Sequence, residues 1–369
     1  YEMTSSLVGS EMCIRDRALA KKWIKHVGET YDLASLSQKS QKFRDLLCDF
    51  YITFNNPEAA IPLLQATLDC YPYSINHWNS LGKCYLSTND YEEAHEAIDF
   101  ALAIDDSNAE ALTLKAFCYQ QSGELQKSCD YYLRLAEQQE NKTRAYLALA
   151  KTYFEMQDYT SSIYYIEALL DNKDALSKYE LSELYGDIAL CHAALKHIGV
   201  GQASIRRSLE LNENDPDTLI VAGRFFLMEA KACNDETAKA ENQAKGELYF
   251  RQALNLIMED ERLDYLFTIG AACFDTQNFK LAAQYYEQIN REFPDNAPAT
   301  YFFLAYCYFY LEEAISCMHY IAKMKHELPD AYSNLGTSDS ILSDTRFNEL
   351  MRNLKDSVNN GKVDLDNFL

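Results

Sequence analysis

Cysteine and histidine are the residue types in this sequence best suited to metal or redox chemistry. The eleven cysteines include no Cys-x2-Cys pair, the spacing typical of zinc sites and reactive dithiols. His192 and His197 stand five residues apart on a predicted helix and so are expected to point to different faces, unlike a ligand pair four residues apart. The spacing therefore predicts neither a metal site nor a redox centre.

Catalytic motifs are also missing from the sequence. It contains no Gly-x-Gly-x2-Gly loop, no P-loop, no His-Glu-x2-His and no Gly-x-Ser-x-Gly. Carboxylates are abundant, but in so acidic a chain a random pair of them has no diagnostic value. We therefore predict that the protein is not an enzyme and uses no cofactor.

The charge balance excludes some classes of partner. The chain of 369 residues carries 56 Asp and Glu against 34 Lys and Arg, which gives a net charge of −22 and a pI of about 4.7. Nucleic acid and anionic membranes both need a basic footprint, so neither is an expected partner. No stretch is long and apolar enough to predict a membrane span. The odd cysteine count without a secretory disulfide framework favours a reducing compartment, the cytoplasm.

A repeating pattern must position whatever site the chain carries. A small residue recurs with steps of 34, 34, 39, 34, 47 and 35 residues; a ring or its substitute follows it by three residues, and a second small residue by twelve. The first set is Gly82, Ala116, Ala150, Ala189, Gly223, Gly270 and Ala305, with Leu47 before them; the second is Phe50, Tyr85, Tyr119, Tyr153, His192, Phe226, Cys273 and Tyr308; the third is Ala59, Ala94, Ser128, Ser162, Gly201 and Ala282. Small side chains let antiparallel helices approach closely, and rings fill the space between units. The period predicts an all-α chain of stacked helix-turn-helix units.

Four cysteines share one place in this pattern. Cys84, Cys118, Cys191 and Cys307 each stand two residues after the small residue of a first helix. We therefore expect buried structural thiols at these positions rather than reactive ones.

The residues Trp78, Leu81, Gly82 and Tyr85 resemble the Trp-x2-Leu-Gly-x2-Tyr signature of the tetratricopeptide repeat (TPR) family. The match is fullest over 75–108 and extends to 109–142, 143–176 and 263–296, with weaker copies at 40–73, 182–215, 216–260 and 298–329. The resemblance implies a right-handed α-solenoid of about eight units over 40–329. It also implies a concave groove, lined by the first helices, that binds peptides or helices.

Two units depart from the period. The unit at 216–260 has 23 residues between Gly223 and Gly246 instead of twelve, so we expect both of its helices to lengthen and its polar tip to project. The unit at 298–329 has only nine residues from Ala305 to Ala314, which predicts a shortened turn or an error in the sequence.

The two ends of the chain lie outside the repeats. Residues 6–17 (SLVGSEMCIRDR) resemble translated sequencing-adapter sequence, so we expect 1–17 to be non-native and disordered and the true N-terminus to be missing. Residues 18–39 read as the remnant of an earlier helix. In 330–369, an amphipathic helix over 344–358 is expected to cap the last unit, with Asp344 or Ser343 at its start and a loose tail after it. Folding of that helix into the groove as an autoinhibitor is the alternative.

Candidate partner-binding residues follow from the resemblance, which places groove residues on the first helices. The early units offer polar residues and the late units mostly aromatic ones: Asn76, Asn79, Lys83, Thr113, Phe117, Arg144 and Lys151, then Arg224, Phe267, Phe274, Phe302, Tyr306 and Phe309. The Lys and Asn clamp with which some relatives grip chaperone tails is not matched, since Asn79 stands where a lysine is needed and Leu114 where an asparagine is. We expect no chaperone-tail recognition.

These features predict a non-enzymatic adaptor that holds an unidentified protein or peptide. Two alternatives stay open: a helical regulatory part of a larger protein, and a cell-envelope lipoprotein of the helical-repeat type whose signal is missing. The aromatic residues of the late units could serve as the docking surface, or Phe302 and Phe309 could be core residues beneath the C-terminal helix.

Overall fold

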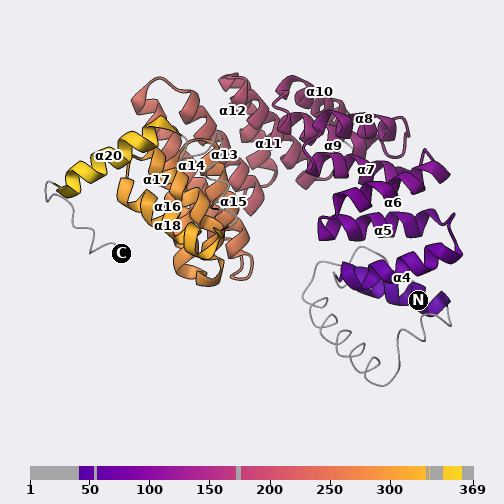
Figure 1. The fold of residues 1–369 in the computed structure, drawn as a ribbon. Helices are drawn as coiled ribbons and strands as arrows, with labels where there is room; N and C mark the ends of the chain where they lie inside the picture. The colour runs from indigo at the N-terminus through magenta and orange to yellow at the C-terminus, as the bar shows by residue number, and fades with distance from the viewer. Residues whose placement is uncertain (1–40, 54–55, 172–175, 330–331, 333–343, 360–369) are drawn as a thin grey trace. The chain divides into compact units, whose positions relative to one another are not determined.

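The computed structural model describes residues 41–53, 56–171, 176–329, 332 and 344–359, and the side chains of 41–43, 46 and 354–359 are outside this description. The expectations for 1–17, for 18–39 and for the tail after 359 therefore fall outside the described residues. Within the described ranges every regular element is a helix and no strand occurs (Figure 1). The predicted all-helical class of antiparallel helix pairs is confirmed.

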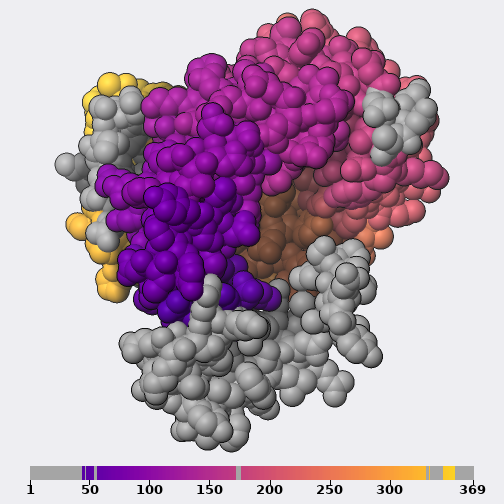
Figure 2. All heavy atoms as spheres, turned by 90° about the vertical axis from the view of Figure 1, so that its right-hand side faces the viewer, coloured from indigo at the N-terminus to yellow at the C-terminus, as the bar shows by residue number. Residues whose placement is uncertain are grey.

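The chain divides into two compact units, Tyr1–Leu169 and Leu170–Leu369. The helices of unit 1 are α3 (Gln41–Thr53), α4 (Pro57–Cys70), α5 (Ile75–Thr88), α6 (Tyr91–Ile104), α7 (Ala109–Gln121), α8 (Leu125–Ala136), α9 (Lys142–Glu155) and α10 (Tyr159–Leu170). Each of these helices packs on the next along the chain from α3 to α9. In the space-filling view the indigo and purple atoms of unit 1 form a continuous packed body, because side chains fill the spaces between helices (Figure 2).

Unit 2 continues the same succession of helix pairs. Its elements are α11 (Lys178–Ala194), α12 (Ile198–Leu211), α13 (Pro216–Ala232), α14 (Glu236–Leu254), α15 (Arg262–Asp275), α16 (Phe279–Glu292), the 3-10 segment η2 (Pro294–Thr300), α17 (Tyr301–Tyr310), α18 (Ala314–Glu327) and α20 (Thr345–Asn359). Its main core cluster extends from α13 to α20 and contains Phe250, Leu266, Ile269, Tyr286 and Leu304.

The first helix of most pairs ends in the same way. Seven residues after the small residue, the chain adopts a left-handed conformation at Asn89, Gly123, Gln157, Lys196, Gln277 and Glu312. The backbone N–H of the following residue then donates to the carbonyl of the ring position five residues earlier, as from Asp90 to Tyr85 at 2.9 Å. This is the Schellman arrangement, which satisfies carbonyls that a helix end would leave unpaired. The same turn therefore recurs wherever a first helix ends with this hydrogen bond.

Small residues set the approach of the paired helices, as the pattern predicts. A Cβ added to Gly82 would lie 2.8 Å from Ile98 Cγ1, and one added to Gly270 would lie 2.8 Å from Tyr286 Cε1. In the longer pair, a Cβ on Gly246 would lie 2.9 Å from the Gly223 carbonyl oxygen, so two backbones meet there. At each of these positions any larger side chain would push the helices apart.

The expanded pair has the expected long helices. Helices α13 and α14 contain 17 and 19 residues, whereas the helices of unit 1 contain 12 to 14. No Gly or Pro interrupts 228–243, and the Asp235 side chain caps α14 by accepting from the N–H groups of Thr237 and Ala238.

The register predicted for the first pair is wrong by one residue. Cys48 and Ala60 are the buried small residues there, 34 residues before Gly82 and Ala94, whereas Ala59 is half-buried. The ring in the same core cluster is accordingly Tyr51 rather than Phe50. Leu47 is also buried, which is why an apolar pattern alone could not separate the two registers.

The shortened turn expected after Ala305 is also wrong. Residues 311–313 join α17 to α18, the same number that joins α15 to α16, and Glu312 has a φ of 61° as Gln277 has 62°. The buried small residue twelve after Ala305 is Cys317, which the sequence pattern overlooked. This pair differs from the others at its start instead, where the 3-10 segment η2 replaces the first turn of α17.

The C-terminal helix α20 packs at the end of the last pair. Phe347 is buried and its ring centroid lies 6.3 Å from that of Phe309, while the Arg346 guanidinium lies over the rings of Phe309 and Tyr310. Asp344 precedes the helix and accepts from the Arg346 N–H at 2.8 Å, as expected for its start. These contacts are those of a helix that covers α17 and α18.

Candidate partner-binding surfaces

The polar residues predicted for the early groove are partly used inside the fold. Asn79 is only 1 % exposed, and its Nδ2 donates to Asn108 Oδ1 at 3.1 Å and to Glu110 Oε2 at 3.0 Å. Lys83 forms an ion pair with the same Glu110 carboxylate. Burial favours a raised pKa for Glu110, but bonds from Lys83 and Asn79 lower that pKa overall. Asn79 and Lys83 thus join α5 to α7 and are less available to a ligand than we expected.

The other early candidates do face solvent. Asn76, Phe117, Arg144 and Lys151 are exposed on α5, α7 and α9, and Thr113 is half-buried with its hydroxyl bonded to the Ala109 carbonyl. These five side chains are spread over three helices. The polar candidates therefore form a scattered set rather than a built site.

The late aromatic candidates form one connected ring network within unit 2. Phe274 lies 5.5 Å from Phe303 and 6.3 Å from Tyr306 between ring centroids, and Tyr306 lies 4.6 Å from Phe302. Phe267 joins the network through Tyr286, which stacks on Phe303. We call the exposed side of this network the aromatic surface, made of Phe267, Phe274, Phe302, Phe303 and Tyr306. Sequence reasoning missed Phe303, although its neighbours on the same helix signalled a ring-rich face.

Exposure differs among these rings. Phe302 is 38 % exposed, while Phe267, Phe274, Phe303 and Tyr306 are half-buried. Phe309 does not belong to the aromatic surface, because it is 6 % exposed and packs against Phe347 of α20. The expectation that Phe309 faces water is therefore corrected in favour of the core alternative. Arg224 is half-buried on α13, with its Nη2 3.8 Å from Asp275 Oδ2.

The sequence analysis missed a second regularity, which is that in several pairs a ring of the first helix stacks on a ring of the second. Tyr119 stacks on Tyr131, Tyr153 on Tyr165 and Tyr308 on Tyr320, each twelve residues apart, and Phe226 stacks on Tyr249 across the expanded pair. The spacing of twelve, already seen for the small residues, could have revealed these partners.

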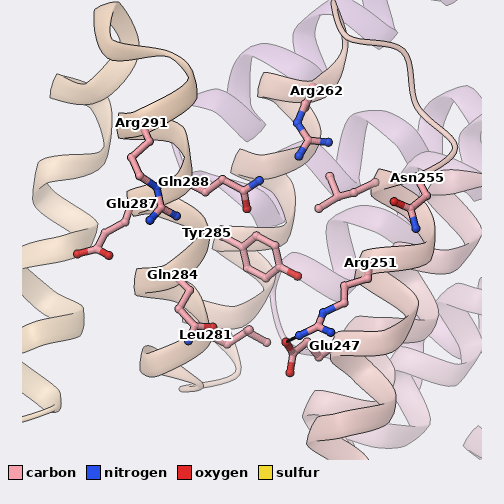
Figure 3. Close-up of a pocket in the computed structure, with 11 residues that line it drawn as sticks. Glu247, Arg251, Asn255, Arg262, Leu281, Gln284, Tyr285, Glu287, Gln288 and Arg291 are labelled. Carbon is pink, nitrogen blue, oxygen red and sulfur yellow. Dashed lines mark hydrogen bonds and ion pairs between the residues drawn. The ribbon is translucent and has the colours of Figure 1, made fainter.

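A cavity of about 620 Å³ lies between α14 and α16 beside the start of α15 (Figure 3). Arg251 and Arg262 turn toward the Tyr285 ring, which stands twelve residues after Cys273 and so lacks the stacking partner of the other pairs. Arg251 is paired with Glu247, and Arg262 Nε lies 2.8 Å from Glu292 Oε2. Because opposite charges are paired along this cavity, its lining indicates no single ligand chemistry.

The titratable groups of the described residues include no candidate metal site. No group of three or more His, Cys, Asp and Glu there could hold a metal ion. The four cysteines that share a repeat position are buried as expected, and burial raises the pKa of Cys84 to about 11, which keeps its thiol protonated. The prediction that His192 and His197 point to different faces is wrong. Helix α11 ends at Ala194, so the turn brings their Nδ1 atoms within 3.4 Å.

Comparison with known proteins finds the same kind of repeat in other chains. The sequence profile of the tetratricopeptide repeat family matches residues 79–143. Residues 79–143 of the chain are therefore similar to tetratricopeptide repeats. The chain is 27 % identical over 179 residues to the formate-dependent nitrite reductase complex subunit NrfG of Escherichia coli O157:H7, a match that covers 47 % of the chain and 83 % of the relative.

Some solved structures are also similar to parts of this chain. A TPR protein from Parabacteroides merdae is 14 % identical with a TM-score of 0.46, over 69 % of this chain and 99 % of that one. The Pseudomonas aeruginosa pilF protein is 18 % identical with a TM-score of 0.41, over 60 % and 92 % of the two chains. In the described part of the chain, no helix is long and apolar enough to cross a membrane.

Proposed function

We propose that this TPR protein is a non-enzymatic adaptor that binds an apolar peptide or helix of a partner protein on its aromatic surface. The observation that carries the proposal is the exposure of Phe302 within a connected set of rings. Exposed clusters of rings are costly in water and usually mark contact sites. Aromatic anchors also supply much of the binding energy at protein interfaces.

The surrounding rings support this role because they hold the anchor in place. Tyr306 and Phe303 both contact Phe302, and Phe274 contacts both of them. A pre-organised anchor loses little side-chain freedom when it binds, which favours affinity. An apolar face of a helix, with residues three and four apart, is the kind of ligand that such a surface fits.

A cytoplasmic location belongs to the same proposal. All ten cysteines among the described residues are free thiols, and eight of them are buried. Free thiols are typical of a reducing compartment. The similarity to a subunit of a reductase complex supports only the general class, an adaptor within a multi-protein assembly.

The test is capture of a partner from the native host with the full chain and with Phe302→Ala. Phe302 is exposed, so the substitution should leave the melting temperature nearly unchanged and should remove the captured protein. Tyr164→Ala is the matched control, since Tyr164 is an exposed ring on α10 at 64 % exposure. Unchanged capture by Phe302→Ala, or equal loss with Tyr164→Ala, would contradict the proposal.

A further inference from the structure

A cavity of about 490 Å³ lies in unit 1 between the second helices α4 and α6, over the first helix α5. Its apolar base includes Leu68, Leu81 and Ala97, and three rings stand around it: Trp78, Tyr85 and Phe100. Three carboxylates, those of Asp69, Glu93 and Glu96, complete the lining together with Gln65 and Pro72. It shares no residue with the aromatic surface.

The cavity exists because one ring of a stacked pair is missing. In the next two pairs, Tyr119 stacks on Tyr131 and Tyr153 on Tyr165. The residue in the corresponding place, twelve after Tyr85, is Ala97. An alanine leaves open the volume that a tyrosine fills in the neighbouring pairs, and the Tyr85 ring borders that space.

The rings around the cavity are held in fixed positions. Trp78 stacks on Phe100 with ring centroids 4.6 Å apart and planes 19° apart, and its Nε1 donates to the Pro72 carbonyl at 2.7 Å. Gln65 Nε2 donates to the Tyr85 hydroxyl at 2.9 Å. Phe100 is nevertheless 54 % exposed. A rigid, partly exposed ring pair is a surface that a flat group can stack on.

The charge of the cavity favours a cation. No Lys, Arg or His lines it, and within the described residues none of its three carboxylates forms an ion pair. The next pair differs in this respect, since Lys115 Nζ and Lys127 Nζ lie 5.6 Å and 5.2 Å from the centre of the Tyr119 ring. The residues in the corresponding places beside Tyr85 are Leu81 and Glu93. Two cations thus lie over the Tyr119 ring, whereas a leucine and a carboxylate take their places in the pair that contains Tyr85.

We propose that this cavity binds the guanidinium group of an arginine on a basic segment of a partner protein. A planar guanidinium stacks on aromatic faces and donates in a fork to carboxylates, so it uses both kinds of group in this lining. The Trp78 and Phe100 rings would lie against its face or its stem, and Glu93 and Glu96 would accept its N–H groups. This inference goes beyond the proposed adaptor function and does not depend on the aromatic surface.

The binding test uses the full chain with Trp23→Phe, which leaves Trp78 as the only tryptophan. The probe is the capped peptide Gly-Ser-Gly-Arg-Gly-Ser-Gly, followed by Trp78 fluorescence, with the same peptide carrying neutral citrulline as the comparison. The arginine peptide should bind at least about tenfold more tightly than the citrulline peptide, and its binding should weaken as salt is added. Equal binding of the two peptides, or no fluorescence change with either, would overturn the inference.

Two sets of variants locate the site. Ala97→Tyr should fill the cavity and abolish binding, whereas Ala103→Tyr, at an exposed position of the same helix, should leave it unchanged. The double variant Glu93→Gln with Glu96→Gln keeps the shape of the cavity but removes two charges. It should lower the affinity for the arginine peptide by about tenfold or more. These Gln variants decide the matter even if Ala97→Tyr folds poorly. Binding that survives the Gln pair, or that is lost with Phe302→Ala instead, would contradict the assignment.

Discussion

Gly82 and Ile98 fix the distance between α5 and α6: a Cβ on Gly82 would lie 2.8 Å from Ile98 Cγ1. Ile98 is fully buried, and the Ala94 carbonyl lies just beyond it, so neither helix can yield without disturbing its neighbours. The same relationship recurs between Gly270 and Tyr286 in unit 2. Close helix crossings at small residues therefore recur in both units of the chain.

Gly82→Leu should overpack this crossing. We expect a loss of about 1–3 kcal/mol in the free energy of unfolding, because the Ile98 side chain and the α6 backbone must move. Urea unfolding followed by circular dichroism measures the loss. Gly199→Leu is the control, since a Cβ there would meet nothing within 4 Å. A Gly82→Leu protein as stable as the control would refute the packing role.

Glu229→Gln should stabilise the protein at neutral pH. Glu229 is buried on α13, and burial raises the pKa of its carboxyl, against weaker opposing effects of Gln202 and Lys245. Its Oε2 accepts from Gln202 at 3.1 Å, whereas its Oε1 has no hydrogen-bond partner among the described residues. A pKa that is higher in the folded state stabilises the fold at low pH, and this contribution is lost as pH rises through the folded pKa. The neutral variant should therefore unfold about 2–4 °C higher at pH 7.5, which corresponds to about 1 kcal/mol.

The pH dependence of that gain is the sharper part of the Glu229 prediction. The difference between Glu229→Gln and the parent should shrink as pH falls toward 4.5, the ordinary value for a glutamate. Thermal melts at four pH values would measure it. A difference that stays constant from pH 7.5 to 4.5 would show that the charge of Glu229 is not the cause.

Phe347→Ala should release α20 from the end of the last pair. Phe347 is the buried contact of α20 with Phe309, and truncation of a buried phenylalanine costs about 3 kcal/mol or more. Amide hydrogen exchange should therefore become faster across α20 and in the last turn of α17 around Phe309, with little change in unit 1. Glu349→Ala, at an exposed position of the same helix, should leave exchange unchanged. Equal protection in both variants would mean that other contacts hold α20.

Much of the fold could be predicted from local chemistry. The small residue, the ring three later and the second small residue twelve later located nearly every helix pair, because each acts within one hairpin. The errors arose where a residue of another type took the same role, as Cys317 did for alanine, or where two registers were both apolar, as at Leu47 and Cys48. The contact of His192 with His197 depended on where α11 ends, which the histidine spacing alone does not specify.

The candidate sites were harder to predict than the fold. The side on which a ring lies follows from its helix. Phe267, Phe274, Phe302 and Tyr306, which the sequence pattern placed together, do lie in one ring network, but the sequence analysis missed its further member Phe303. Burial depends on partners far along the chain, and for this reason Asn79, bound by Glu110, and Phe309, covered by Phe347, were misjudged as solvent-facing. The cavity beside Ala97 was missed because it comes from an absent ring.

The measurement that tests the adaptor function most directly is site-specific photocrosslinking in the native host. A benzoylphenylalanine at position 302 should crosslink one partner protein, and peptide mapping should place the crosslink on an apolar segment of that partner. The same residue at position 164, an exposed ring position on α10, should not crosslink that protein. Crosslinking of the same partner from position 164 but not from position 302 would contradict binding at the aromatic surface.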